Sequence, residues 1–291
     1  MKLSKFHGLG NDYLVLLDRR PRTPPDAEAI RALCDRHLGV GADGLLLHAP
    51  PTGGAQYGLR IFNPDGSEAE KSGNGIRIFA RYLVDHCGAG SQFTISTLGG
   101  LVPCVVGPEA VTAHMGTASF RPADVPCTFE VDEVVQIPLE HAGEEFTVTA
   151  VGIGNPHCVV FLDDVALLDA TRWRRWGPLL EVHPSFPNRT NVQFAKALGP
   201  RKLSLRIWER GAGETSASGS SACAAAAAAV KTGRCQPGWI AVHMPGGVLD
   251  VVVGEDYSLR LRGPVEEIAA VELSPSWLQA RGLATIHLPP A

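Results

Sequence analysis

The sequence predicts an α+β protein made of two halves of similar fold, each a curved sheet around one central helix. Two observations support this prediction. Short apolar or alternating runs, which are typical of strands, occur along the whole chain with only a few helical stretches between them. Four short stretches of the first half also recur in the second half at nearly one spacing, which is about half of the 291 residues.

The repeated stretches indicate an internal duplication. LRIF returns as LRIW, GLGN as GIGN, LGGL as PGGV, and Ser72-Gly73 as Ser218-Gly219. The offsets are 146, 144, 147 and 146 residues, from 205 minus 59, 152 minus 8, 245 minus 98 and 218 minus 72. Composition bias toward glycine and alanine is the alternative explanation, but it does not account for one shared offset. We expect an N-terminal domain over 1–116 and a C-terminal domain over 117–267, with the segment from about 268 to 291 returning to the first.

Strands are predicted in both halves from apolar runs and period-two alternation. The clearest are DYLVLLD at 12–18, GLLLHA at 44–49, QFTIST at 92–97 and EFTVTAV at 145–151. Runs of this length suit the strands of a sheet rather than long helices.

Four stretches predict helices. DAEAIRALCDRHLG at 26–39 has an acidic first turn, and we expect it to stop at Gly39. The runs from Gly73 and from Gly219 are the equivalent central helices, and the second is alanine on nearly every face, so we expect it to be buried. Near the C-terminus, Ser274 followed by Pro275 is typical of a helix cap and first turn.

Composition excludes several classes of function. Charges are mixed with a formal net of -4, so we expect neither nucleic-acid binding nor an acidic tail. No apolar run reaches the roughly 20 residues that span a bilayer. The N-terminus lacks a signal-peptide core, which predicts a cytoplasmic protein. The seven cysteines are odd in number and include no CxxC pair, which favours free thiols over disulfides or a zinc site.

Common cofactor and metal motifs are not convincing here. GVGADG at 39–44 fits the dinucleotide-binding spacing, but it follows a predicted helix and precedes a predicted strand, the reverse of the required order. The ten histidines show no metal-binding spacing. We therefore expect no metal and no cofactor.

Four polar loops, at 63–75, 154–158, 188–191 and 208–221, remain as candidates for a site. Each alone could be a surface turn. Because two of them precede the central helices, we expect them to face each other across a cleft between the halves. Asparagines and Arg210 could fix an amino acid, helix N-termini could hold a second carboxylate, and Glu209 and His157 could orient or relay protons.

The loops, together with the first strand, carry a recognisable resemblance. The blocks KFHGLGNDY, FNPDGSEAEKSGNGIR, GNPHCV, RTNVQF and WERGAGETSASGSSACAA are similar, in order and along nearly the whole chain, to the diaminopimelate epimerase family. The resemblance implies a cofactor-independent isomerase with two pseudo-symmetric, mostly antiparallel domains. It implies conversion of LL- to meso-diaminopimelate, a small-molecule amino acid of the lysine and peptidoglycan route. It is also compatible with a homodimer.

The resemblance also implies roles for individual residues. In the family one cysteine from each half acts, one as thiolate base and the other as thiol acid, on opposite faces of the α-carbon. The residues that would hold the distal amino-acid end are Asn63, Asn155, Asn191 and Arg210. Those that would surround the reacting end are Asn11, Gly73, Asn74, Gly219 and Ser220. His157 and Glu209 would lie beside the proton-transfer residues.

This sequence departs from the family pattern where the chemistry occurs. Both cysteines are serines, Ser72 and Ser218, and Ser221 stands where the family usually has glycine. An engineered pair of replacements and a natural serine branch both explain the two serines. Ser221 favours the natural branch, because it replaces no cysteine and an inactivating experiment would not need it.

Serine is a much weaker acid than cysteine. A cysteine has a reference pKa of about 8.5, whereas a hydroxyl that resembles water has one of roughly 15.7. At about 1.36 kcal/mol per unit, forming the base costs on the order of 10 kcal/mol more. A helix N-terminus contributes only about 0.3–2 kcal/mol, so the two-thiol reaction should be nearly absent.

Three functions therefore stay open from the sequence. The first is an impaired or altered epimerase of the diaminopimelate type. The second is an isomerase or lyase that acts on another amino-acid-like substrate and uses Glu209 or His157 for proton transfer. The third is a non-catalytic amino-acid binder.

Overall fold

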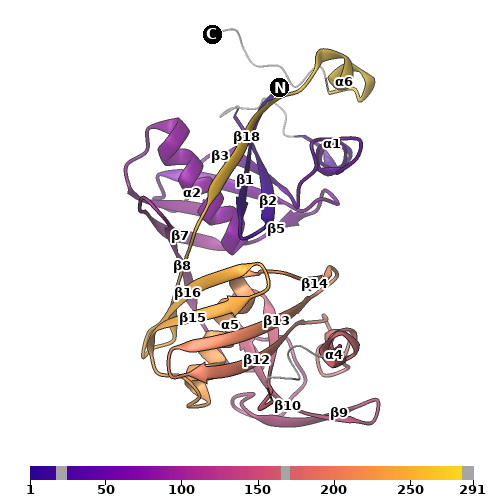
Figure 1. Ribbon diagram of the computed structural model, residues 1–291, viewed down its shortest axis with the longest axis vertical. Helices are drawn as coiled ribbons and strands as arrows, with labels where there is room; N and C mark the ends of the chain where they lie inside the picture. The colour runs from indigo at the N-terminus through magenta and orange to yellow at the C-terminus, as the bar shows by residue number, and fades with distance from the viewer. Residues whose placement is uncertain (18–24, 165–170, 284–291) are drawn as a thin grey trace. The chain divides into compact units, whose positions relative to one another are not determined.

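A computed structural model describes residues 1–17, 25–164 and 171–283 (Figure 1). Contacts within the chain divide it into two compact units. Unit 1 comprises Met1–Ala113 and Pro264–Ala291, and unit 2 comprises His114–Gly263. The C-terminal segment belongs to unit 1 because its strand pairs with the first strand of the chain; residues 284–291 of that segment lie outside the described residues.

Unit 1 is a mixed sheet with a buried helix. Its elements are β1 (Lys2–Gly8), β2 (Asn11–Leu16), α1 (Ala27–Cys34), β3 (Leu45–Ala49), β4 (Tyr57–Phe62), β5 (Glu68–Ala69), α2 (Gly73–Cys87), β6 (Gln92–Thr97), β7 (Gly100–Val106), β8 (Val111–Thr117), which continues into unit 2, β18 (Glu266–Glu272) and α6 (Pro275–Ala280). β18, β1 and β2 pair in antiparallel fashion, and β2–β3 and β4–β6 are the parallel pairs. The remaining neighbours, β3–β4, β4–β5, β6–β7 and β7–β8, are antiparallel.

Unit 2 repeats this arrangement strand for strand. Its elements are β9 (Ile137–His141), β10 (Glu144–Gly152), β11 (Pro156–Phe161), α4 (Arg172–Glu181), β12 (Asn191–Gly199), β13 (Lys202–Glu209), β14 (Gly213–Thr215), α5 (Gly219–Lys231), β15 (Gly238–Met244), β16 (Gly247–Val253) and β17 (Ser258–Gly263). Two pairs are parallel, β11–β12 and β13–β15. They correspond to the parallel pairs β2–β3 and β4–β6 of unit 1. All other pairs in this unit, including β9–β10, are antiparallel.

The repeats found in the sequence occupy equivalent places in the two units. GLGN and GIGN lie at the turns β1–β2 and β10–β11, and the LRIF and LRIW stretches lie in β4 and β13. LGGL and PGGV lie at the hairpins β6–β7 and β15–β16. The predicted duplication, and with it the two-part α+β fold, is confirmed.

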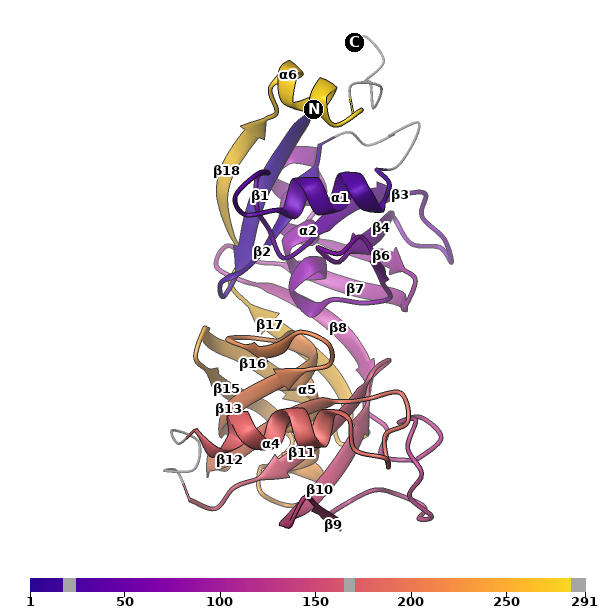
Figure 2. The same cartoon turned by 90° about the vertical axis from the view of Figure 1, so that its right-hand side faces the viewer.

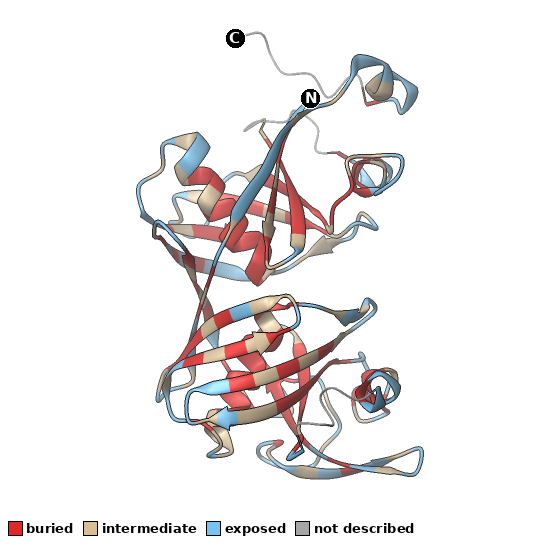
Figure 3. Cartoon of the chain, in the orientation of Figure 1, coloured by how far each residue is buried: buried red, intermediate tan, exposed pale blue. Residues whose placement is uncertain are grey.

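Most of α5 and the first turns of α2 are buried because the sheet of each unit curves around its central helix (Figure 3). α2 packs against β1, β2, β4 and β7. α5 packs against the strands β10, β11, β12, β13, β15, β16 and β17, and the run Ala224–Ala229 is fully buried. Small side chains on every face let strands approach from every side, which explains why a helix with so weak an apolar stripe is buried. The expectation for this helix is confirmed.

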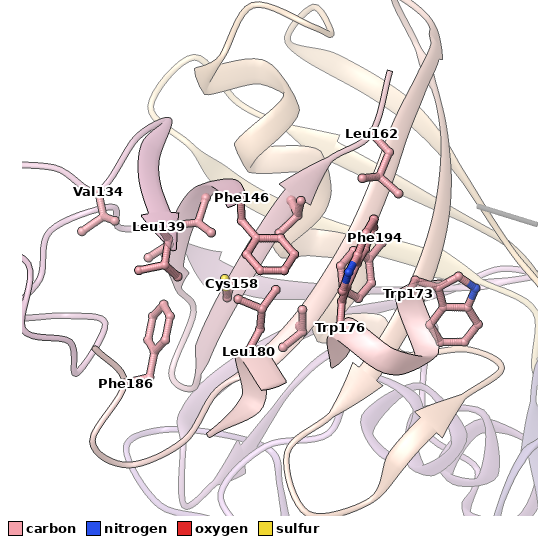
Figure 4. Close-up of a cluster of buried hydrophobic side chains, with 14 of the residues drawn as sticks. Val134, Leu139, Phe146, Cys158, Leu162, Trp173, Trp176, Leu180, Phe186 and Phe194 are labelled. Atoms are coloured by element: carbon pink, nitrogen blue, oxygen red, sulfur yellow. The ribbon is translucent and has the colours of Figure 1, made fainter. Parts of the chain in front are cut away.

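Each unit also carries a helix beside its sheet, α1 in unit 1 and α4 in unit 2 (Figure 2). An apolar cluster joins each of these helices to its sheet. In unit 1, Ile30 and Leu33 of α1 pack against leucines of β1, β2 and β3. In unit 2, Trp173 and Trp176 of α4 pack with Phe146 and Phe194 (Figure 4). The rings of Phe146 and Trp176 lie 5.6 Å apart at 87°, an edge-to-face arrangement that aromatic pairs prefer.

The helix ends show where the sequence was and was not sufficient. α1 ends at Cys34, five residues before the predicted stop, because the Asp35 carboxylate accepts hydrogen bonds from His37 N and Leu38 N at 2.8 and 2.7 Å. This turn satisfies the backbone amides outside a helix. At the other end of the chain, Ser274 caps α6 as predicted, with Trp277 N donating to its Oγ at 3.2 Å. The four predicted strands form β2, β3, β6 and β10.

Among the described residues, no helix combines the length and hydropathy that crossing a membrane would require.

Candidate active site

The two serines lie at the same point of the two units. A strand, a loop and a short second strand lead into the central helix, as β4–β5 before α2 and as β13–β14 before α5. Ser72 and Ser218 are the N-caps of these helices, both with extended backbone. The Oγ of Ser72 accepts from Gly75 N at 3.1 Å, and that of Ser218 from Ser221 N at 3.5 Å.

The caps place both hydroxyl oxygens at the positive end of a helix. Unpaired N–H groups and the helix dipole at such an end favour a negative charge. A second hydroxyl lies beside each cap: Tyr13 Oη is 3.1 Å from Ser72 Oγ, and Ser220 Oγ is 3.4 Å from Ser218 Oγ. The surroundings suit an anion, but a neutral serine does not supply one.

Removing either cap should cost stability. We expect Ser72→Ala and Ser218→Ala each to lower the free energy of unfolding by about 1 kcal/mol, because a helix amide loses its acceptor. Urea unfolding measures this difference. The asparagine variants are matched controls that keep a capping oxygen and should stay within a few tenths of a kcal/mol of the wild type. Alanine variants as stable as the wild type would show that these hydroxyls do not cap the helices.

In unit 1, Asn11 and Asn74 are brought together in a chain of side-chain hydrogen bonds. Asn74 Nδ2 donates to Asn11 Oδ1 at 3.0 Å, and Asn11 Nδ2 donates to Asp43 Oδ2 at 2.8 Å. Arg77 completes the chain: Nη2 donates to Asn74 Oδ1 at 2.8 Å, and the side chain is fully buried. Both amides thus have an acceptor and a donor in use, and they hold the β1–β2 turn against the start of α2.

An ion-pair cluster supports the same turn. Lys5 Nζ lies 3.0 Å from Asp12 Oδ2, and Arg36 bridges Asp12 and Asp43 at 2.7 and 2.6 Å. Burial of the Asp12 carboxyl would raise its pKa, but the hydrogen bonds from Arg36 and Lys5 outweigh burial and hold that pKa below its usual value. The cluster keeps Asp12 charged next to Asn11.

Asn63 stands apart from this chain. It follows β4 and is partly exposed, and its Nδ2 donates to Ser67 Oγ at 3.0 Å. Its Oδ1 has no hydrogen-bond partner among the residues that the structure describes. Gly73, between the cap and Asn74, is buried as the first residue of α2.

Unit 2 contains a continuous buried network. His157 Nε2 lies 2.9 Å from Asn155 Oδ1, and His157 Nδ1 lies 3.0 Å from Gln193 Nε2. Gln193 Nε2 also donates to Ser221 Oγ at 3.0 Å. Asn155, at the turn before β11, is the one partly exposed member, while the others are buried. Sequence reasoning did not single out Gln193; its polar side chain inside an apolar strand was the available signal.

His157 is neutral in this environment. Burial lowers the pKa of His157 to about 3, and the positive charge of Arg210 adds to the shift. Both ring nitrogens already have partners. The ring is therefore a weak base without a free nitrogen, which argues against its predicted role as a proton carrier and favours an orienting role.

Asn191 and Arg210 are brought together through the backbone. Asn191 Nδ2 donates to Pro156 O at 2.9 Å, and Arg210 N donates to Asn191 Oδ1 at 3.0 Å. The Asn191 side chain is buried, and both its Nδ2 and its Oδ1 are hydrogen-bonded. It therefore supports the backbone of Arg210 and has no unpaired amide atom to offer a ligand. Arg210 is exposed, and its Nη1 donates to Asn188 O at 3.4 Å. Glu209, the last residue of β13, is partly exposed beside it.

The start of α5 completes the predicted set. Gly219 is buried as its first residue, and Ser220 is partly exposed. Burial raises the pKa of Cys158, next to His157, to about 12, so this thiol is not a ready source of thiolate. None of the seven cysteines, all of which lie in the described part of the chain, forms a disulfide, and within the described residues no group of three or more His, Cys, Asp or Glu is arranged to hold a metal ion.

Comparison with known sequences gives matches along most of the chain. The family model described as diaminopimelate epimerase matches residues 3–121 and 149–266. A protein of Nostoc sp. named diaminopimelate epimerase 2 is 46% identical over 277 residues, which cover 94% of this chain and 96% of the relative. The diaminopimelate epimerase of Desulforudis audaxviator is 44% identical over 279 residues, covering 92% of this chain and 97% of the relative.

Comparison with solved structures gives the same fold at low sequence identity. A probable proline racemase from Agrobacterium radiobacter K84 has a TM-score of 0.71 at 15% identity, covering 98% of both chains. A hydroxyproline epimerase from Agrobacterium vitis has a TM-score of 0.69 at 16% identity, covering 93% of this chain and 91% of that one. Likeness at these identities shows the architecture alone.

Proposed function

We propose a substrate and a chemical limitation for this chain, which belongs to the diaminopimelate epimerase family and is a cofactor-independent epimerase of that type. The substrate is diaminopimelate, converted between the LL and meso forms in the route to lysine and peptidoglycan precursors. The limitation is the pair of serines, which makes proton transfer slow. The identity of 40–46% to relatives named diaminopimelate epimerase supports the substrate.

The single observation that carries the proposal is the equivalence of Ser72 and Ser218. Each caps the central helix of its unit after the same hairpin. The resemblance to the family implies that each stands where the family has a catalytic cysteine. In the proposed reaction these two side chains face opposite sides of the substrate α-carbon. One would have to remove the α-proton while the other delivers a proton to the opposite face, which inverts the centre.

The retained polar residues support substrate binding. Arg210 is an exposed cation held in place by Asn191, and Asn155 is a partly exposed amide beside His157. Arginine and amide N–H groups suit the carboxylate of an amino acid. We propose that this group holds the distal end of the substrate, together with Asn63, and that Asn11, Asn74, Gly73, Gly219 and Ser220 surround the reacting end.

A second candidate is an isomerase or lyase that moves its proton with Glu209. The observation that favours it is the state of His157, whose two nitrogens are both hydrogen-bonded and whose burial lowers its pKa to about 3. Of the two carriers considered from the sequence, Glu209 is thus the better one. In this version the serines act only as hydrogen-bond partners of the substrate.

Solvent deuterium exchange separates these functions. The protein is incubated in D₂O with LL-diaminopimelate, and incorporation at the α-carbon is followed by mass spectrometry and NMR. Slow incorporation with diaminopimelate supports the epimerase. Incorporation only with other amino-acid-like compounds supports the second candidate, and that exchange should be lost in Glu209→Gln. Binding of diaminopimelate without any exchange would identify a non-catalytic binder.

Arg210 gives a separate test of the binding site. We expect Arg210→Met to abolish the increase in melting temperature that diaminopimelate causes, because the carboxylate loses its charged partner. Thermal unfolding with and without the ligand measures this. Arg260→Met, at an exposed arginine of β17, is the matched control and should keep the ligand effect. An unchanged ligand effect in Arg210→Met would remove Arg210 from the site.

A further inference from the structure

The buried network of Asn155, His157, Gln193 and Ser221 has a defined hydrogen-bond direction. The Gln193 amide nitrogen has two N–H donors. One points at His157 Nδ1 and the other at Ser221 Oγ, each over 3.0 Å. Nδ1 therefore accepts, the ring proton is on Nε2, and Nε2 donates to Asn155 Oδ1 at 2.9 Å.

The opposite direction is disfavoured by what it would leave unpaired. In the observed direction, one buried atom of the network, Gln193 Oε1, has no partner among the described residues. If the amide were reversed, its oxygen would face His157 and Ser221, and both N–H donors would be buried without acceptors. Buried N–H groups without a partner are rarer than carbonyl oxygens with unused lone pairs. The hydroxyl of Ser221 matters here, because a glycine at this position would leave one Gln193 donor unpaired even in the observed direction.

We propose that Gln193 and Ser221 are positioning residues that fix His157 as the Nε2–H tautomer and thereby set which atom of Asn155 faces a ligand. With Oδ1 bound to His157, Asn155 presents its NH₂ group, and Nδ2 has no partner among the described residues. The exposed Arg210 lies near enough for its charge to act on His157. Asn155 and Arg210 therefore both present N–H donors.

Two such donors favour an anionic oxygen over a cation as their ligand. The ligand group is thus a carboxylate rather than an ammonium group, which deepens the proposed function because an amino acid carries both. The hydrogen-bond direction itself does not rest on that function. It can be measured without substrate or turnover.

Long-range ¹H–¹⁵N NMR of the full protein tests the direction, because it distinguishes a protonated from an unprotonated ring nitrogen. The His157 signals are assigned by their disappearance in His157→Gln. We expect Nε2 to be protonated and Nδ1 to be unprotonated at pH 7. A proton on Nδ1 of the wild type would overturn the proposal.

Two variants test the roles of Gln193 and Ser221. Gln193→Glu offers Nδ1 only acceptor oxygens, so we expect a proton to appear on Nδ1. Ser221→Ala removes one acceptor of the Gln193 amide, so we expect a mixture of tautomers, and Ser221→Thr should restore the single form. Ser96→Ala removes a buried hydroxyl in unit 1 and is the control for general destabilisation; it should leave the His157 signals unchanged. An unprotonated Nδ1 in Gln193→Glu, or wild-type signals in Ser221→Ala, would overturn the role of that residue.

The ligand preference is tested with simple ions. Titration with acetate should shift the side-chain NH₂ signals of Asn155, whereas titration with methylammonium chloride should not. A reversed preference would show that Asn155 presents its oxygen and would contradict the proposal. A failure of diaminopimelate to bind or exchange, with the tautomer and the acetate response as expected, would count against the proposed function alone.

Discussion

Replacing both Ser72 and Ser218 with cysteine is expected to raise the rate of α-proton exchange in diaminopimelate by several orders of magnitude. The two hydroxyls lie at helix N-termini, where a thiolate would be stabilised by amides such as Gly75 N. The difference in pKa between a hydroxyl and a thiol is about 7 units, and each unit changes the free energy of the charged form by about 1.36 kcal/mol. Forming the charged base therefore costs the double variant on the order of 10 kcal/mol less than it costs the wild type.

The single variants should behave differently from the double variant. With one cysteine, a thiolate removes the α-proton and can return a deuteron from solvent to the same face, so label enters while the configuration is retained. With both, the second thiol delivers its proton to the opposite face and the centre inverts. Mass spectrometry measures the label, and chiral chromatography measures the ratio of LL- to meso-diaminopimelate.

Ser274→Cys is the matched control for this experiment. Ser274 is also the N-cap of a helix, with its Oγ accepting from Trp277 N, but it lies at α6 outside the candidate site. A cysteine there should leave exchange at the wild-type rate. If the double variant at 72 and 218 keeps its fold and also exchanges at the wild-type rate, the assignment of the pocket is wrong. Adding Ser221→Gly to the double variant tests whether that departure limits activity.

The duplication could be predicted from the sequence because both copies keep the same backbone turns. The hairpins at 98–101 and 245–248 and the caps at Ser72 and Ser218 are local features, and local features leave matching residues at a fixed offset. The strands and the central helices follow from period-two and apolar patterns in the same way. These features position the site within each unit.

Other parts of the fold depend on contacts that no local pattern records. α4 was not predicted because Gly177 and Pro178 lie inside it, and both disfavour a helix. Gly177 is required by packing: a Cβ at this position would lie 2.7 Å from Trp208 Cγ. The helix forms because Trp173 and Trp176 on one face complete the apolar cluster.

The polar groups of the site were only partly predictable for a similar reason. The motif residues could be found from the family blocks, but some of the hydrogen-bonded pairs lie far apart in sequence: Gln193 and Ser221 are 28 positions apart, and Asn11 and Asn74 are 63. Arg77 was visible as one charge in the first turns of α2, yet only the fold shows it fully buried against Asn74. Residue types indicated which groups could bind a substrate, whereas the hydrogen bonds show which of their atoms are already used.

The state of His157 makes stability depend on pH in a defined window. Burial lowers its pKa from 6.5 to about 3 in the folded protein, whereas the unfolded chain titrates at the ordinary value. Above pH 6.5 the ring is neutral in both states, so the full stability is present. As the pH falls from 6.5 to about 3, the unfolded chain binds a proton at His157 that the folded protein does not bind. The free energy of unfolding therefore decreases by up to about 1.36 kcal/mol per pH unit. The total loss is on the order of 5 kcal/mol.

This loss is measured as a difference between variants, because carboxylates such as Asp12 titrate over part of the same range. Urea unfolding of the wild type and of His157→Gln is followed between pH 7 and pH 4. His157→Gln is expected to be less stable at pH 7, since the bonds to Asn155 and Gln193 change, but its stability should fall less steeply with decreasing pH. His37→Gln, at an exposed histidine after α1, is the control for the substitution itself. Parallel curves for the wild type and His157→Gln would mean that His157 binds its proton with the same pKa in the folded protein and in the unfolded chain, which would contradict the shift caused by burial.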